Sequence, residues 1–412
     1  MKQNRQSIFL VVVVAVVMVT SWQSSAMASS TVDERMVRME QRMQRMERQL
    51  QKQSQEIRAK DRRISELEQK QLGSSPGDDW FQSVTFSGAV EIEASGTDSD
   101  GFSGDDASDI NVATAELGIE AVINDWTTAN LVLLWEEEDG GSSDLTVDEA
   151  IITFANPDVT PFYFTAGRTA APFGRFDTNM VSDPLTMDIG ETKETLLLVG
   201  IETEGFYASV YGFNGDLDDG GDNVIDNGGV DLGFTWEETD RSVDFGVSYI
   251  NDIGDSDGVS DVISGNLPGG VDYRRNVPSY AAHAMFTVGG FNLIGEYVTA
   301  SKQFDLTNEL AFNGSGAKPS AWNLEAGYSF QLAGHESAVA VGFQKTKEAL
   351  GLGLPEKRIS AAFSVVILEN TTFSLEWAHD EDYGTGDLDA VSGTAGTGTD
   401  SDTITAQLAI EF

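Results

Sequence analysis

The sequence predicts an all-β protein: a transmembrane antiparallel β-barrel of about 16 strands, preceded by a short α-helical coiled coil. Three observations predict this fold. From Val84 onward, apolar and polar side chains alternate in segments of roughly ten residues. The connections between these segments alternate between short and long. After the first 28 residues, no apolar stretch is long enough to cross a membrane as a helix.

Residues 1–28 have the pattern of a cleaved secretory signal peptide. Lys2 and Arg5 precede an apolar run over residues 8–19, and Ala26-Met27-Ala28 provides a cleavage site between small residues. The alternative is an uncleaved anchor helix, but the run is shorter than the roughly 20 residues that span a bilayer. We therefore expect the protein to be exported.

Residues 29–72 predict a periplasmic coiled-coil helix. Apolar residues recur at spacings of three and four, and Gln53 and Lys60 occupy the two intervening core positions. The apolar positions are Val32, Met36, Met39, Met43, Met46, Leu50, Ile57, Ile64 and Leu67. A coiled coil implies a homo-oligomer, and its methionine-rich seam leaves dimer and trimer both open. Residues 73–83, which contain Gly and Pro, form a linker.

Residues 84–412 predict the outer-membrane barrel. The final segment, "TITAQLAIEF", alternates apolar and polar residues, and we expect it to pair with the first strand and close the barrel. The predicted strands cover residues 84–94, 110–122, 127–136, 145–155, 161–168, 195–203, 206–213, 229–237, 242–250, 279–288, 291–300, 321–330, 337–345, 357–367, 372–380 and 402–412.

Loop lengths orient the predicted barrel. Short connections such as 123–126, 156–160 and 289–290 separate long ones such as 95–109, 169–194, 251–278 and 381–401. With the coiled coil in the periplasm, the short turns lie there and the long loops face outward, so the predicted location is the outer membrane of a Gram-negative bacterium. Outer-membrane lipid and lipopolysaccharide are then the expected surroundings. A soluble sandwich is the alternative, but it would not need this alternation of loop lengths.

The composition narrows the function. The formal net charge is −42, which disfavours nucleic acid as a partner because an acidic surface repels phosphate. The chain has no cysteine, so disulfides and thiolate chemistry are excluded. Strand alternation places a set of acidic residues on the lumen side with few basic partners, which predicts a preference for cations. These acids are Glu91, Glu93, Glu116, Glu120, Glu237, Asp244, Glu325, Glu376 and Glu411.

The third long loop, residues 169–194, is the predicted constriction. It mixes proline and phenylalanine with charged residues, and the third loop of sixteen-stranded porins typically folds inward. The candidates for contact with solute are Arg168, Arg175, Asp177, Asn179, Asp183 and Lys193. An ordinary surface loop is the alternative.

Other patterns carry less weight. "GDSDG" (residues 254–258) matches a nucleophile motif that needs a strand before it, a helix after it and a partner histidine, but it lies in an acidic, glycine-rich loop. "DLDDGGDNVID" (residues 216–226) resembles a calcium loop but lacks the required glutamate at its twelfth position. His283, His335 and His379 lack the spacing of metal ligands. Nothing in the sequence requires an enzyme or a cofactor.

Several stretches resemble the LbtU-type siderophore porin family: "SGAVEIEAS", "DIGETKET", "FYASVYGFNGD" and above all "PFYFTAGRTAAPFGRFDTNMVSDPLT" (Pro161 to Thr186). The resemblance implies an outer-membrane barrel with a periplasmic coiled coil that takes up ferric siderophore as a small-molecule solute, without a TonB-dependent plug. A polycarboxylate siderophore would be repelled by an acidic lumen unless Arg168, Arg175 and Lys193 form a basic path. The alternatives are a general cation-preferring porin and a structural barrel that tethers the envelope through its coiled coil.

Overall fold

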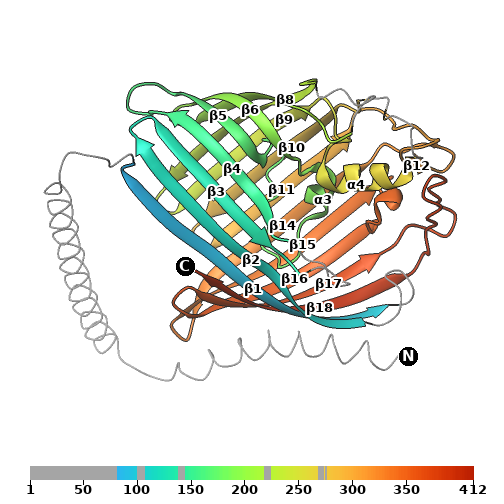
Figure 1. Cartoon of the computed structure of the whole chain (residues 1–412). Coiled ribbons are helices and arrows are strands. Elements are labelled where there is room, and N and C mark those ends of the chain that lie inside the picture. Colours follow the sequence, from blue (N-terminus) through green and yellow to red (C-terminus); the bar gives the residue numbers. More distant parts are fainter. Residues whose placement is uncertain (1–80, 100–106, 138–143, 218–223, 268–272, 274–275) are drawn as a thin grey trace, which may run out of the picture. The chain divides into compact units, whose positions relative to one another are not determined.

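A computed structural model describes residues 81–99, 107–137, 144–217, 224–267, 273 and 276–412 (Figure 1). The chain divides into two units, residues 1–79 and 80–412, and all of the described residues belong to the second. The predicted signal peptide, the predicted coiled-coil helix and residues 73–80 of the predicted linker therefore lie outside the described residues. Among the described residues, no helix is long and apolar enough to cross a membrane.

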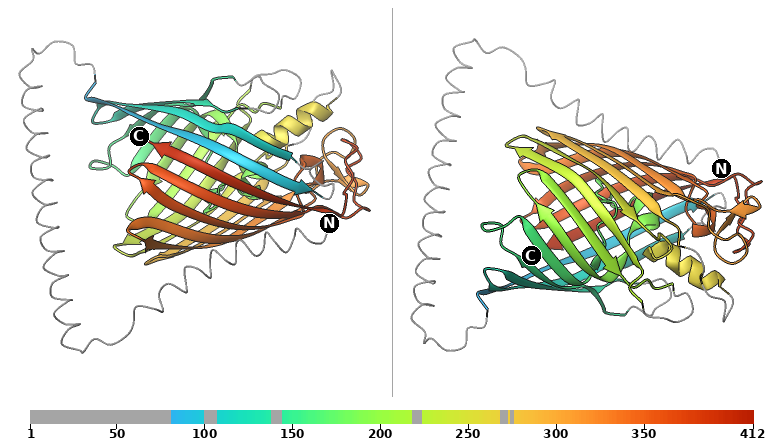
Figure 2. Two further views of the ribbon diagram at one scale, coloured as in Figure 1. Left: turned by 90° about the horizontal axis from the view of Figure 1, so that it is seen from below. Right: turned by 90° about the horizontal axis from the view of Figure 1, so that it is seen from above.

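Sixteen strands form a closed antiparallel barrel, which confirms the predicted fold class (Figures 1 and 2). Strands that follow one another in the barrel pair as neighbours, and β18 pairs with β1 to close it, with Thr405 opposite Ser95. The barrel strands are β1 (Ser83–Ser99), β2 (Ala107–Asn124), β3 (Thr127–Trp135), β4 (Thr146–Ala155), β5 (Phe162–Ala170), β6 (Lys193–Glu202), β7 (Phe206–Phe213), β8 (Asn227–Glu238), β9 (Arg241–Ile250), β10 (Ser279–Val288), β11 (Phe291–Ala300), β14 (Ser320–Leu332), β15 (His335–Lys347), β16 (Lys357–Leu368), β17 (Thr371–Glu381) and β18 (Asp400–Glu411).

The two ends of the barrel differ. Tight turns such as 239–240, 289–290 and 369–370 lie at one end, which we call the turn end, together with Phe412 (Figure 1). The opposite end, the loop end, carries the long connections. We name the third (171–192) L3, the fifth (251–278) L5, the sixth (301–319) L6 and the eighth (382–399) L8. The predicted alternation of loop lengths is therefore present.

Alternation along each strand separates an apolar outer face from a more polar inner one. On β15, Val341 and Phe343 are exposed on the outer face, whereas Gln344 and Thr346 are buried on the inner face. Aromatic rings gather on the outer face near both ends. Phe234 lies between Phe206 and Phe245 near the turn end, with ring centroids 5.1 and 5.6 Å apart.

Short elements occur inside loops where the sequence predicted no structure. They are α3 (Leu185–Gly190), α4 (Asp257–Asn266), η1 (Leu350–Leu352) and the hairpin of β12 (Ala311–Phe312) and β13 (Ser315–Gly316). α3 contacts β11, β14 and β15, and it also contacts α4. These elements are too short to be stable alone, so tertiary packing must maintain them.

L3, L5 and L6 share one apolar core with the inner wall of β6–β15. Phe173 and Ile189 of L3, Ile263 of α4 and Phe304 of L6 belong to it and are almost completely buried. Inner positions of β6–β15 are accordingly buried, whereas those of β1–β5 and β16–β18 are mostly half-buried. The water-accessible part of the lumen therefore lies along β16–β18 and β1–β5, which we call the open side.

Candidate channel constriction

L3 crosses the lumen and is fixed to the wall opposite its origin. Gly174 (φ +79°) and Phe176 (φ +58°) turn the chain just after β5. The left-handed conformation at these two positions brings the following backbone amides to face β11, β14 and β17. L3 consequently divides the filled β6–β15 side of the lumen from the open side.

Glu296 on β11 is the first attachment point. Its side chain accepts hydrogen bonds from the backbone N–H of Arg175 at 2.7 Å and of Phe176 at 3.2 Å, and from the Thr186 hydroxyl at 2.8 Å. Glu296 is only 3% exposed. A buried carboxylate needs several donors to offset its lost hydration, and L3 supplies them.

Two further glutamates hold the middle of L3. Glu325 on β14 accepts from the Thr178 hydroxyl at 2.7 Å and from the Asn179 backbone N–H at 2.6 Å. Glu376 on β17 accepts from the Ser182 hydroxyl at 2.6 Å and from its backbone N–H at 3.0 Å. Both glutamates are almost fully buried. These two predicted lumen acids thus lie beneath L3 and bind the loop.

The remaining predicted acids have different surroundings. Glu91 and Glu93 on β1, with Glu116 and Glu120 on β2, occupy inner positions of the open side. The Gln407 side-chain amide donates to Glu91 at 3.3 Å and to Glu93 at 2.9 Å. Asp244 on β9 accepts from Arg175, and the inner-face residues Glu237 and Glu411 lie toward the turn end of β8 and β18.

L3 presents the predicted candidates Asp177, Asn179 and Asp183. Asp177 and Asp183 are exposed, whereas Asn179 is held by Glu325 and accepts a hydrogen bond from Asn292 at 2.6 Å. Asp183 repels both Glu91 and Glu93 electrostatically, so acidic groups face each other across the open side.

The predicted basic residues do not form a common path. The Arg175 guanidinium pairs with Asp244 at 2.8 Å, and Lys193 pairs with Asp148 at 2.6 Å. Arg168 lies in register with Ala150 and Thr195, on the outer face of β5 and not on the lumen face. Its placement differs from the prediction because side chains alternate between faces, and the inner positions here belong to Thr165 and Thr169.

Sequence reasoning missed Glu296 and Arg358. Arg358 lies on the inner face of β16 and donates two hydrogen bonds to Asp380, at 2.8 and 3.0 Å. The alternation of Arg358 with Ser360 and Ala362 could have revealed it. The role of Glu296 could not be found in this way, because its donors lie more than a hundred positions earlier in the chain.

Asp188 on α3 lies near both Arg358 and Asp183, and these neighbours affect its pKa. Burial raises the pKa of Asp188 to about 6; Arg358 opposes that rise, and Asp183 adds to it. Below pH 6, Asp188 is therefore mostly protonated and uncharged. Above pH 6 it is ionised, and L3 then carries its full negative charge.

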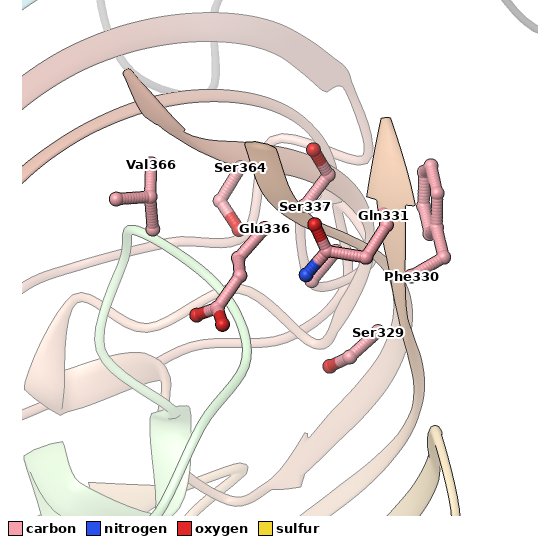
Figure 3. A pocket seen from close by; sticks show the side chains of 8 residues that line it. Ser329, Phe330, Gln331, Glu336, Ser337, Ser364 and Val366 are labelled. Atoms are coloured by element: carbon pink, nitrogen blue, oxygen red, sulfur yellow. The ribbon is translucent and has the colours of Figure 1, made fainter. Parts of the chain in front are cut away.

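A cavity of about 490 Å³ lies near the turn end of the inner wall (Figure 3). Gln331 of β14 and Glu336 of β15 are directly opposite each other in register, and Ser364 of β16 also lines the cavity. Among the residues that the structure describes, no group of three or more His, Asp or Glu side chains is arranged to hold a metal ion.

Comparison with known proteins gives relatives of unstated activity. The chain is 31% identical over 331 residues to UPF0422 proteins of Legionella pneumophila strains Lens and Philadelphia 1, with 74% of this chain aligned. A UPF0422 protein of Coxiella burnetii is 29% identical over 306 residues. The chain spans 62% of the length of the Legionella relatives. No family model matches the chain.

Solved structures with a similar fold are outer-membrane channels and porins. The outer membrane channel DcaP of Acinetobacter baumannii superposes with a TM-score of 0.52 and 13% identity, covering 80% of this chain and 97% of that one. OmpF of Salmonella typhi, in complex with daunomycin, gives 0.54 and 15%, covering 82% and 99%. These likenesses show a porin-like barrel fold.

Proposed function

We propose that the protein is an outer-membrane diffusion channel of a Gram-negative bacterium that prefers cationic solutes. The turn end lies in the periplasm and the loop end faces outward. The closed barrel satisfies every strand's backbone pairing while presenting an apolar outer face to lipid. The predicted coiled coil would add oligomerisation on the periplasmic side.

The observation that carries this proposal is the asymmetry of the lumen. L3 and the loop core fill the β6–β15 side, so solute passes between L3 and the open side. Glu91, Glu93 and Asp183 face that passage, while Arg175 and Arg358 are each paired with an aspartate. An excess of acidic over basic groups raises the local concentration of cations and opposes anions.

Reversal potentials in asymmetric KCl across a planar bilayer test the preference. The full-length protein should give a cation-selective potential, and Glu91→Gln with Glu93→Gln should shift it toward zero. Glu204→Gln with Glu369→Gln, which removes the same charge at two turns of the turn end, is the matched control and should leave it unchanged. An anion-selective wild type would overturn the proposal.

Ferric siderophore is a second candidate solute. The stretch that resembles the siderophore porins most, Pro161 to Thr186, includes the part of L3 held by Glu296, Glu325 and Glu376. Titrating ferric siderophores into the same recordings should produce saturable block that weakens in Arg175→Gln. Conductance without block would leave a general cation channel.

A further inference from the structure

Two lysines lie directly opposite each other on the outer face of the barrel. Lys345 of β15 pairs in register with Lys357 of β16 near the loop end. Both share the face of the exposed residues Val341 and Phe343, which is the face that elsewhere is apolar. Like charges directly opposite destabilise a sheet, so this pair needs a compensating partner.

Basic residues are far more frequent around these lysines than in the barrel as a whole. Lys347 lies two residues beyond Lys345 and its side chain is 73% exposed, and the Lys318 backbone N–H donates to Glu348 at 2.9 Å. Three lysines (Lys345, Lys347 and Lys357) stand beside three glutamates (Glu348, Glu356 and Glu381), and Asp400 lies opposite Glu381 in register, so basic and acidic groups nearly balance here. Residues 73–412 together carry 12 basic and 59 acidic residues.

The glutamates use only some of the N–H donors of the lysine ammonium groups. Lys345 lies 3.3 Å from Glu356, Lys357 lies 2.6 Å from Glu381, and Lys347 lies 3.4 Å from Glu348. Each ammonium has three N–H donors, so one carboxylate contact does not saturate it. The lysines can therefore bind a second anion while keeping these pairs.

Aromatic residues set the depth of the lysines. Trp322 of β14 is directly opposite Lys345 on the same face and stacks on Tyr297, with ring centroids 4.2 Å apart. Tryptophan and tyrosine on a barrel's outer face prefer the level of lipid headgroups. The lysines accordingly lie at, or just above, the headgroups of the outer leaflet.

We propose that Lys345, Lys347 and Lys357 bind a phosphate group of an outer-leaflet lipid headgroup. This proposal rests on the membrane placement given under the proposed function. Phosphate supplies several acceptor oxygens that can bridge the facing ammonium groups and relieve their repulsion. Because these side chains point away from the lumen, lipid binding is expected to be independent of conduction.

The experiment is a lipid titration of the detergent-solubilised full-length protein, read by native mass spectrometry. The probes are diphosphoryl lipid A, the same lipid without its phosphates, and inorganic phosphate. Lys345→Gln with Lys357→Gln should weaken binding of diphosphoryl lipid A about tenfold or more, and Lys345→Arg with Lys357→Arg should restore it. Lys302→Gln with Arg241→Gln, which removes two charges elsewhere on the surface, is the matched control.

Equal binding of the two lipids, or equal binding by wild type and the glutamine pair, would overturn the proposal. If Lys345→Gln with Lys357→Gln changed the oligomeric state but not lipid binding, the proposal would also be overturned. This face would then be assigned to contact with a second copy of the chain. Conductance of the same samples separates the two proposals. A protein that conducts but ignores lipid phosphate refutes only the lipid site, and one that binds lipid but never conducts refutes only the channel.

Discussion

Glu296 shows how one carboxylate can fix L3 in place. It accepts three hydrogen bonds from both ends of the inward part of L3, at Arg175, Phe176 and Thr186. Glu296→Ala leaves these donors without a partner, at about 1–3 kcal/mol for each group that stays buried. L3 should then detach, giving noisier single-channel currents and faster proteolysis within residues 171–192.

The control for this variant is Glu120→Ala, which removes a carboxylate from an exposed position on the open side. Its rate of cleavage in L3 should equal that of wild type. Unchanged cleavage and quiet currents in Glu296→Ala would mean that the apolar core alone holds the loop.

Asp255 gives L5 a pH dependence with a definite sign. Burial raises its pKa to about 7, and Asp252 and Asp216 add to the rise, while the Leu217 backbone N–H opposes it. A carboxyl whose pKa is higher in the folded state binds more protons there than in the unfolded state. Stability should therefore fall as the pH rises from about 4 to about 7 and level off above that range.

Thermal unfolding midpoints measured from pH 5 to pH 8 check this expectation. Asp255→Asn should make the slope shallower, because one of the carboxyls that titrate in this range is gone. Asp261→Asn, an exposed position on α4, serves as the charge-matched control and should keep the wild-type slope. A steeper slope in Asp255→Asn would contradict the assigned cause.

On the inner wall, tyrosine rings of one strand pack on glycines of the neighbouring strand and so hold the two strands together. A Cβ added at Gly233 of β8 would lie 2.0 Å from Cζ of Tyr207 on β7, so only glycine allows this contact. Gly233→Val should displace the ring and lower the unfolding temperature, as overpacking typically costs 1–3 kcal/mol. Gly96→Val in β1, where the added Cβ meets nothing within 4 Å, is the control.

The elements themselves could be predicted from the sequence because a half-buried strand must alternate apolar and polar residues. The sixteen predicted strands are present, although β1 ends at Ser99 and β2 begins at Ala107, beyond the predicted limits. The extra residues are mostly polar, so they pair without an apolar pattern to reveal them. α3 and α4 depend on contacts between loops, which local sequence does not encode.

The candidate site could be predicted only in part. Alternation identified inner-face acids such as Glu93 and Glu325, but it could not say that one faces open lumen and the other lies beneath L3. That distinction depends on Thr178 and Asn179 reaching a strand nearly 150 positions later. The pairing of Arg175 with Asp244 is hidden for the same reason.

In the whole barrel, loops fill one side of the lumen and leave the other side open. Loops that share an apolar core occupy β6–β15, and the acidic passage follows β16–β18 and β1–β5. Under the proposed function, this arrangement would let a wide barrel select solutes. Its selectivity would come from the charges that border the passage.

Thiol modification can distinguish the open side of the lumen from the filled side, because the chain has no cysteine of its own. Thr405→Cys places one thiol on the inner face of the open side, and Ser248→Cys places one on the inner wall beneath L3, where Ser248 accepts from the Gly174 backbone N–H at 3.0 Å. We expect a cationic methanethiosulfonate reagent to reduce conductance through Thr405→Cys and to react there faster than an anionic one. Ser248→Cys should be unaffected. Block of Ser248→Cys alone, or faster reaction of the anionic reagent at Thr405→Cys, would contradict the account.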